Sequence, residues 1–310
     1  MRSLMLFFLL AITQHAFSQE VFKTQPVLQE IISQFPTVRD FTISPTQDEI
    51  YFTAQGYSGE LSTIIKVKKT GDKWSNPTVA PFSGQYSDLE AMFSPDGLRL
   101  FFVSNRPKEN SKKDQKDQDI WYIKRSDAAS DWSKPINIGA PINTDGNEFY
   151  PSISENGNLY FTSTGSGTKG KDDIFMSQWK NNTYTNPISL PEAINSEGYE
   201  YNAYIAPDES FLIFGGYQRE DGLGSGDLYI SRKAKDGNWS KAKNLSGQIN
   251  SDKMDYCPYY DIKTMTLYFT SKRTIIKDDF STLKTLEQLL KLMNSYENGL
   301  SKIYSTRIKL

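Results

Sequence analysis

Four acidic residues recur along the chain at intervals of 52 to 60 residues, namely Asp88, Glu148, Glu200 and Asp255. Carboxylates that converge on one site could bind a cation such as Ca²⁺, hold a basic peptide, or serve as the acid and base of glycoside hydrolysis. They could also accept hydrogen bonds that join one repeat to the next. Recurrence in nearly every repeat favours this structural role, because catalysis needs two or three unlike residues. We therefore assign no catalytic residue and no metal ligand.

Glu90 and three arginines are the other candidates for ligand binding. Arg106 and Arg273 occupy equivalent positions in their repeats, and Arg39 lies near the predicted ring of carboxylates. A sialidase would use three arginines, but the turns "DGNW" and "SDW" lack the spacing of its Asp-box motif. The predicted ligand-binding set is Asp88, Glu90, Glu148, Glu200, Asp255, Arg39, Arg106 and Arg273.

Histidine and cysteine are nearly absent, and this excludes several chemistries. The single histidine, His15, lies in an apolar leader, and the single cysteine is Cys257. A chain without the leader has no imidazole, which excludes Ser-His-Asp and Cys-His catalysis and His-ligated metals. We expect no cofactor, with Ca²⁺ at the acidic ring as the alternative.

A repeat of 50 to 60 residues organises the chain that carries these candidates. Each copy has two alternating strands joined by a turn such as "SPDG" or "SENG", then a third strand and an aromatic-containing turn. Four antiparallel strands repeated radially predict an all-β, five-bladed β-propeller. We expect a signal peptide at 1–18 and one domain over 19–310, with repeats at about 39–88, 89–148, 149–200, 201–255 and 256–310.

The last repeat ends after its third strand, at "IYSTRIKL". The stretch "VFKTQPVLQEI" near the front of the chain matches the missing fourth strand, and Phe22 falls where other repeats have an aromatic residue. Pairing the two ends would remove two exposed sheet edges. We therefore predict that residues 20–38 close the ring.

The pattern "SPDG", "LFFVSNRP" and "DIWYIKR" resembles the WD40-like repeats of the TolB type, also called PD40. This resemblance covers residues 39–310. It implies a β-propeller in the envelope of a Gram-negative bacterium, usually a binding scaffold. The linking pattern "INTDGNEFYPSIS" and "INSEGYEYNAYIA" is similar to propellers of envelope proteins of the Bacteroidetes type. TolB has an extra N-terminal domain and six blades, so the resemblance does not extend to a role in the Tol system.

The leader and the overall composition bear on location and partners. Residues 1–18 carry one arginine, an apolar run and small residues, as in a secretory signal peptide. No later stretch is apolar enough to span a bilayer, and the near-neutral net charge of −2 disfavours nucleic acid. We expect an exported monomer, periplasmic or alternatively extracellular, whose partner is an envelope protein, a peptide or a glycan.

Long, variable loops between second and third strands mark one face of the propeller as the binding face. One of these loops contains a predicted helix at 281–297, whose apolar stripe should pack on that face or beside blade five. The leading prediction is a non-catalytic binding or scaffold protein, which makes an enzyme the less favoured class. The alternative is a carbohydrate-active hydrolase of the glycosidase or sialidase kind, since five-bladed glycosidases place three carboxylates on inner strands around the channel.

Overall fold

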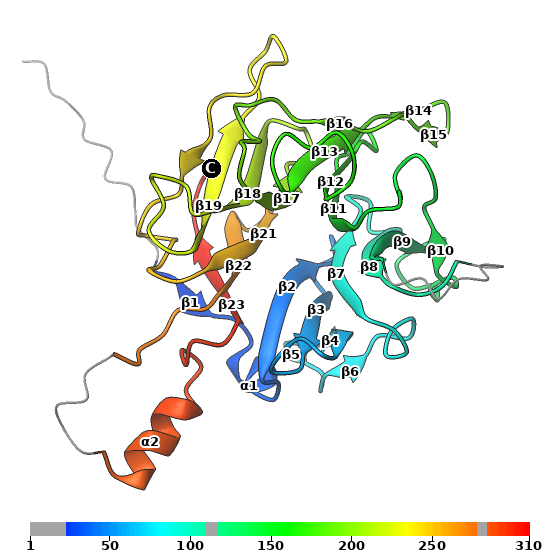
Figure 1. Ribbon diagram of the computed structural model, residues 1–310. Coiled ribbons are helices and arrows are strands. Elements are labelled where there is room, and N and C mark those ends of the chain that lie inside the picture. Colours follow the sequence, from blue (N-terminus) through cyan, green and yellow to red (C-terminus); the bar gives the residue numbers. More distant parts are fainter. Residues whose placement is uncertain (1–22, 109–116, 278–283) are drawn as a thin grey trace, which may run out of the picture.

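The computed structural model describes residues 23–108, 117–277 and 284–310. Figure 1 shows five small antiparallel sheets arranged radially around a central axis. The first strand of each sheet contacts the first strands of both neighbouring sheets, so these five strands form an inner ring. The predicted five-bladed β-propeller is therefore confirmed.

Each blade runs from an innermost strand to a short outer strand. The innermost strands are β2 (Thr37–Ile43), β7 (Asp88–Phe93), β11 (Glu148–Ile153), β17 (Glu200–Ile205) and β21 (Asp255–Asp261). The second strands are β3 (Glu49–Gln55), β8 (Arg99–Ser104), β12 (Leu159–Ser163), β18 (Phe211–Tyr217) and β22 (Thr266–Ser271). The third strands are β4 (Ser62–Thr70), β9 (Asp119–Lys124), β13 (Asp173–Ser177), β19 (Gly226–Arg232) and β23 (Lys302–Arg307). The outer pieces are β1 (Gln25–Pro26), β5 (Lys73–Trp74), β6 (Thr78–Val79), β10 (Ile136–Asn137), β14 (Trp179–Lys180), β15 (Thr183–Tyr184), β16 (Ile188–Ser189) and β20 (Lys243–Asn244).

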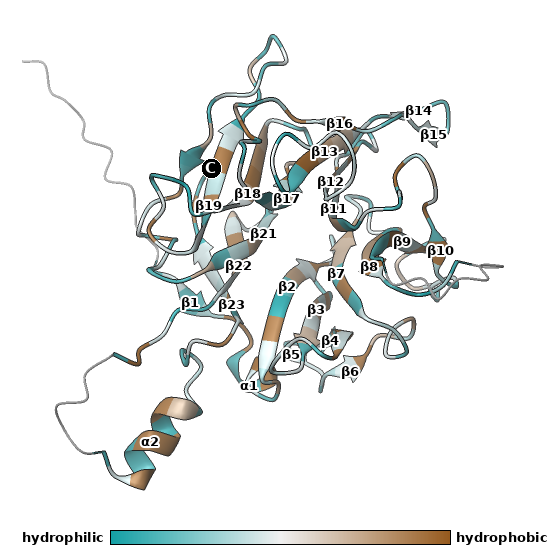
Figure 2. Ribbon diagram, viewed as in Figure 1, coloured by the Kyte–Doolittle hydropathy of each residue, from teal (hydrophilic) through white to brown (hydrophobic). Residues whose placement is uncertain are grey.

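The hydrophobic core lies between the faces of neighbouring blades. Between the first two blades, Tyr51 and Ile64 of one sheet share a buried cluster with Phe93 and Phe102 of the next. Figure 2 shows hydrophobic and hydrophilic segments following one another along strands such as β2. Burying one such side chain stabilises the fold by roughly 1.5–3 kcal/mol, so packing between blades holds the ring together.

The tight turns keep the face opposite the long loops compact. In the "SPDG" turn, Gly97 has φ 71°, a left-handed conformation that glycine adopts without strain, and its N–H donates to Ser94 O at 2.8 Å. The Ser94 hydroxyl also accepts from Arg99 N at 3.0 Å. Such turns set the register of the first two strands and so place the start of each inner strand at the opposite face.

The two ends of the described chain meet in the fifth blade, as predicted. Strand β1 pairs antiparallel with β23, with Gln25 opposite Ser305 and Pro26 opposite Tyr304. Val27 N donates to Ile303 O at 3.1 Å, and buried Val27 joins the core. Phe22, predicted to fill the aromatic position, lies outside the described residues.

Closure predicts a measurable stability difference between two truncated chains. A chain that starts at Gln29 loses the β1 pairing and the burial of Val27, and it exposes the edge of β23. We expect its melting temperature to fall by about 10 °C relative to a chain that starts at Lys23, since a few kcal/mol are lost. Differential scanning calorimetry of the two chains measures this, and equal melting temperatures would contradict the closed ring.

In the part of the chain that the structure describes, two helices accompany the blades, α1 (Gln29–Ile32) and α2 (Leu286–Met293). Helix α2 lies within the predicted range, and Thr285 caps it through a capping box with Gln288. The prediction that its apolar stripe is buried is wrong. Figure 1 shows α2 projecting from the propeller, and its stripe is 42% to 72% exposed, at Leu286, Leu289, Leu290 and Met293. The stripe follows from local periodicity and the cap from local hydrogen bonds, and neither requires contact with a blade.

Within the described ranges, no helix has the length and apolar character needed to cross a bilayer.

Candidate active site at the channel mouth

Every inner strand carries a β-bulge at the same position of the repeat. The register with the second strand shifts there in all five blades. The residue at each bulge has a left-handed φ of 50° to 60°, which is strained for a residue other than glycine. These residues are Asp40, Glu90, Tyr150, Asn202 and Cys257. Because bulges re-aim side chains, five unlike groups meet near the axis.

The bulge residues form one buried hydrogen-bonded network with Arg39. Arg39 Nε donates to Asp40 Oδ1 at 2.9 Å, and Arg39 Nη2 donates to Glu90 Oε1 at 2.6 Å. Asn202 Nδ2 donates to the same Glu90 oxygen at 3.2 Å. Glu90 Oε2 accepts from Tyr150 N at 2.6 Å. The guanidinium of Arg39 thus donates hydrogen bonds to two carboxyl groups, those of Asp40 and Glu90.

The charge balance of this network favours a protonated carboxyl group. Burial raises the pKa of Glu90 to about 7, against the opposing effect of Arg39 and with a further contribution from Asp40. Arg39 itself stays cationic, because Asp40 and Glu90 raise its pKa although burial alone would lower it. One buried cation neutralises one carboxylate, so the second carboxyl group keeps its proton up to about neutral pH.

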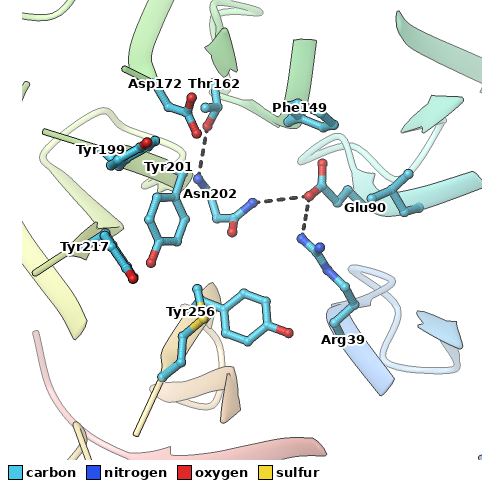
Figure 3. A pocket seen from close by; sticks show the side chains of 12 residues that line it. Arg39, Glu90, Phe149, Thr162, Asp172, Tyr199, Tyr201, Asn202, Tyr217 and Tyr256 are labelled. Atoms are coloured by element: carbon cyan, nitrogen blue, oxygen red, sulfur yellow. Dashed lines mark hydrogen bonds and ion pairs between the residues drawn. The ribbon is translucent and has the colours of Figure 1, made fainter. Parts of the chain in front are cut away.

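A cavity of about 480 Å³ opens above this network, on the face that carries the long loops. Figure 3 shows Glu90 and Arg39 on one side of it and Tyr199, Tyr201 and Tyr217 on the other. All five blades contribute to its lining, which is Arg39, Leu89, Glu90, Phe149, Thr162, Asp172, Tyr199, Tyr201, Asn202, Tyr217, Met254 and Tyr256.

Glycines shape the tyrosine side of the cavity. A Cβ at Gly215 would lie 2.6 Å from the Tyr201 ring, and a Cβ at Gly226 would lie 2.6 Å from its hydroxyl oxygen. Only glycine allows Tyr201 to lie this close to the sheet. The Tyr201 hydroxyl is buried against Gly226 and has no hydrogen-bond partner among the described residues.

Asp172 supplies a second carboxyl group to the cavity. It precedes β13 and pairs with Tyr199 in an isolated parallel bridge, which places it on the tyrosine side. The side chain is half-buried. Burial raises the pKa of Asp172 above the ordinary value for aspartate, and Asp173 and Glu200 add to the shift.

The recurring acidic residues predicted to form a rim lie outside this cavity, at the entry to their inner strands. Asp88 pairs with Arg106 at 2.6 Å, and Asp255 pairs with Arg273 at 3.0 Å. Glu200 pairs with Arg219 at 2.9 Å, which repeats the arrangement in a third blade. Each arginine also donates to a backbone carbonyl about 24 residues earlier in the chain, at Phe82, Ile249 or Ile194.

Glu148 occupies the same repeat position without an arginine partner among the described residues. Its Oε1 accepts from Thr144 Oγ1 at 2.6 Å and from Ser163 Oγ at 3.4 Å. Burial raises the pKa of Glu148 to about 7, against the effect of the Thr144 hydrogen bonds. Glu148 therefore resembles Glu90 in burial and pKa but does not line the cavity, and it provides a matched control.

Of the eight residues in the predicted ligand-binding set, the structure brings Arg39 and Glu90 together in the cavity. Asp172 and the tyrosines were not predicted from the sequence. Asp172 and Tyr199 lie just before strands, whereas Tyr201, Tyr217 and Tyr256 lie at strand ends. One signal was present, because Asp40, Glu90, Tyr150, Asn202 and Cys257 are unlike residues at one repeat position.

The described residues contain no group of three or more His, Cys, Asp or Glu side chains that could hold a metal ion. Ca²⁺ at the acidic rim stays a prediction.

Comparison with solved structures defines the architectural class. A structure described only as a glycoside hydrolase shares 7% identity and a TM-score of 0.55, over 94% of this chain and 92% of that chain. The endo-arabinase of Bacteroides thetaiotaomicron shares 14% identity and a TM-score of 0.52, over 94% and 98%. The catalytic domain of the Coprinopsis cinerea GH62 α-L-arabinofuranosidase shares 9% and 0.52, over 93% and 96%. At such identities the likeness establishes the five-bladed propeller fold.

No family model matches the chain. No curated protein matches it either.

These comparisons correct the functional predictions made from the sequence. The three structures named above are a glycoside hydrolase, an endo-arabinase and an α-L-arabinofuranosidase, and none is of the TolB type suggested by the repeat pattern. The prediction of a non-catalytic scaffold, and with it the preference against an enzyme, is contradicted by these neighbours. The alternative of a carbohydrate-active hydrolase is the better supported of the two, and the site's own residues carry the case for it.

Proposed function

We propose that this protein hydrolyses glycosidic bonds of a glycan bound in the cavity at the channel mouth. The observation that carries the proposal is the position of Glu90, a buried carboxyl group that Arg39 and Asn202 hold at the floor of a tyrosine-lined cavity. Burial there raises the pKa of Glu90 to about 7. Glycoside hydrolysis needs a carboxylic acid that keeps its proton near neutral pH and a second carboxylate across the scissile bond. Glu90 and Asp172 supply these two groups.

Glu90 acts as the general acid. It donates its proton to the glycosidic oxygen as the bond from that oxygen to the anomeric carbon breaks, and the resulting carboxylate is stabilised by Arg39 Nη2 at 2.6 Å. Asn202 and the Tyr150 N–H hold the two carboxyl oxygens in place. The strained bulge that aims Glu90 inward is retained because the neighbouring blades hold it through these contacts.

Asp172 acts as the general base. It accepts a proton from a water molecule whose oxygen attacks the anomeric carbon, so the products are a sugar hemiacetal and an alcohol. Its raised pKa makes it a stronger base than an exposed aspartate. The proton left on Asp172 returns to solvent, and Glu90 takes up another before the next turnover.

The cavity lining suits a carbohydrate. Four tyrosines line the cavity and can offer ring faces to the C–H surface of a sugar, at Tyr199, Tyr201, Tyr217 and Tyr256. The exposed Tyr199 and Tyr217 can also offer hydroxyls to its polar edges. Arg39 stacks over the Tyr256 ring at 5.3 Å, which fixes that ring beside the acid.

The pH dependence of kcat/KM tests these roles. Glu90 must be protonated, so activity should fall about tenfold per pH unit above about pH 7. Asp172 must be ionised, so activity should also fall in acid, with a midpoint above that of an ordinary aspartate. The rates would be measured on the most rapidly cleaved member of a neutral polysaccharide panel.

The Asp172→Asn variant assigns the acid limb of this profile. We expect the residual activity of the variant to lose its acid limb and to keep the limb near pH 7. A wild-type profile that is flat from pH 5 to pH 9, or an acid limb that persists in Asp172→Asn, would contradict the assignment.

We also propose that the protein works outside the cytoplasm. The leader over residues 1–18 supports export, and the repeat pattern supports a bacterial envelope, with the periplasm as the proposed compartment. A reporter such as alkaline phosphatase fused after the leader, active only once exported, tests this.

A further inference from the structure

A second cavity, of about 540 Å³, lies beside the proposed active site on the same face. The loop between β3 and β4, the segment before β7 and the segment after β8 line it, through Glu60, Leu61, Ser62, Gly84, Gln85, Tyr86, Ser87, Asn105 and Pro107. Ser87 lines this cavity and Leu89 lines the first. The two residues are two positions apart on extended chain, a spacing of roughly 7 Å, so the cavities adjoin and one ligand of several sugar units could occupy both.

The second cavity has a fixed aromatic surface. Tyr86 is 39% exposed, and Arg106 stacks against its ring at 5.5 Å. Arg106 is itself held by Asp88 at 2.6 Å and by Phe82 O at 2.9 Å. The ring therefore has a supported side and an open side, and it loses little conformational entropy when a ligand covers it.

The remaining lining is polar and carries little charge. Ser62, Gln85 and Asn105 offer hydroxyl and amide groups, and among the described lining residues Glu60 is the one ionisable side chain apart from Tyr86. Asn105 Oδ1 accepts from Ser87 N at 2.9 Å, which orients the amide group. An aromatic plane bordered by neutral donors and acceptors matches the C–H faces and hydroxyl edges of sugars.

We propose that this second cavity binds further units of the glycan chain whose cleavage point lies in the first cavity, so that the preferred substrate is a neutral polysaccharide. This inference rests on the proposed hydrolytic function and adds its substrate length. The sugar units in the second cavity hold the chain so that its scissile bond stays between Glu90 and Asp172. Short substrates occupy the first cavity only.

Tyr86→Ala tests the inference, with Trp179→Ala as a control. Trp179 is also about one-third exposed, but it lies on the outer hairpin of blade three. Both variants would be assayed on the polysaccharide that the wild type cleaves fastest among arabinan, xylan, galactan, mannan and β-glucan, and on a disaccharide derivative of it. We expect Tyr86→Ala to lower kcat/KM roughly tenfold on the polymer and to leave the disaccharide rate unchanged. Trp179→Ala should change neither rate.

The outcomes separate this inference from the proposed function. Cleavage by the wild type with no loss in Tyr86→Ala, or with equal loss on both substrates, overturns the second cavity alone. If the wild type cleaves none of the five polymers, gel electrophoresis through each polymer decides. If a polymer slows the migration of the wild type but not of Tyr86→Ala, the second cavity is supported and the hydrolytic function is contradicted. If no polymer slows the wild type, both the second cavity and the hydrolytic function are contradicted.

Discussion

Replacing Glu90 with glutamine should lower kcat for glycan hydrolysis about 10³-fold, because the variant keeps the shape of the side chain but has no proton to donate. KM should change little, since the tyrosines that bind the sugar are untouched. The amide also cannot accept from both Arg39 and Tyr150 N, so the free energy of unfolding should fall by about 1–3 kcal/mol. Steady-state kinetics and urea denaturation measure these quantities.

Glu148→Gln is the matched control for this experiment. Glu148 is as buried as Glu90 and has a similar pKa of about 7, but it bonds Thr144 outside the cavity. We expect Glu148→Gln to lose stability on the same scale and to keep kcat within about threefold of the wild type. If Glu90→Gln and Glu148→Gln lost activity equally, the loss in Glu90→Gln would be explained by reduced stability. That result would contradict the role of Glu90 as the general acid.

Replacing Arg39 with methionine should be the most destabilising single change at the site. Asp40 and Glu90 would then remain buried without their cation, and removing one partner of a buried ion pair costs about 3–5 kcal/mol. The pKa of Glu90 should rise further in this variant, because Arg39 opposes its upward shift. The basic limb of the rate profile should move to higher pH with it.

The loss of stability in Arg39→Met should depend on pH with a defined sign. A carboxyl group with a folded-state pKa above its unfolded value stabilises the fold below the unfolded pKa and loses that contribution as pH rises through the folded pKa. The variant should therefore be closer to the wild type at pH 5 than at pH 8.5. Urea denaturation at both pH values measures this, with Arg232→Met as control because exposed Arg232 stacks on Phe211 at 6.0 Å. If the loss of stability in Arg39→Met were the same at both pH values, the protonated carboxyl group inferred beside Arg39 would be contradicted.

The ring and its closure could be predicted from the sequence because both depend on local signals. Turn sequences such as "SPDG" and "SENG" and the alternating strands recur along the chain, and the segment near its front matches the fourth strand that the fifth repeat lacks. The packing of α2 could not be predicted in this way. Its periodicity fixes which side chains share a face, whereas the partner of that face depends on tertiary contacts.

The candidate site was only partly predictable for a related reason. The repeat places Asp88 and Glu90 two residues apart on one strand, and nothing in the sequence distinguishes the roles of these two acidic residues. The bulge separates them, because it turns Glu90 toward the channel while Asp88 pairs with Arg106. Asp172 and Tyr217 come from loops and strand ends whose lengths differ between blades, so their convergence depends on the closed ring. Repeat position alone therefore could not identify them.

Release of new reducing ends tests the central claim most directly. Purified wild-type protein, Glu90→Gln and Glu148→Gln would be incubated side by side at pH 6.5 with the five polysaccharides. The account predicts reducing ends from at least one polymer with the wild type and with Glu148→Gln, and a rate about 10³-fold lower with Glu90→Gln. Equal release by the wild type and Glu90→Gln, or none by any of the three proteins, would contradict it.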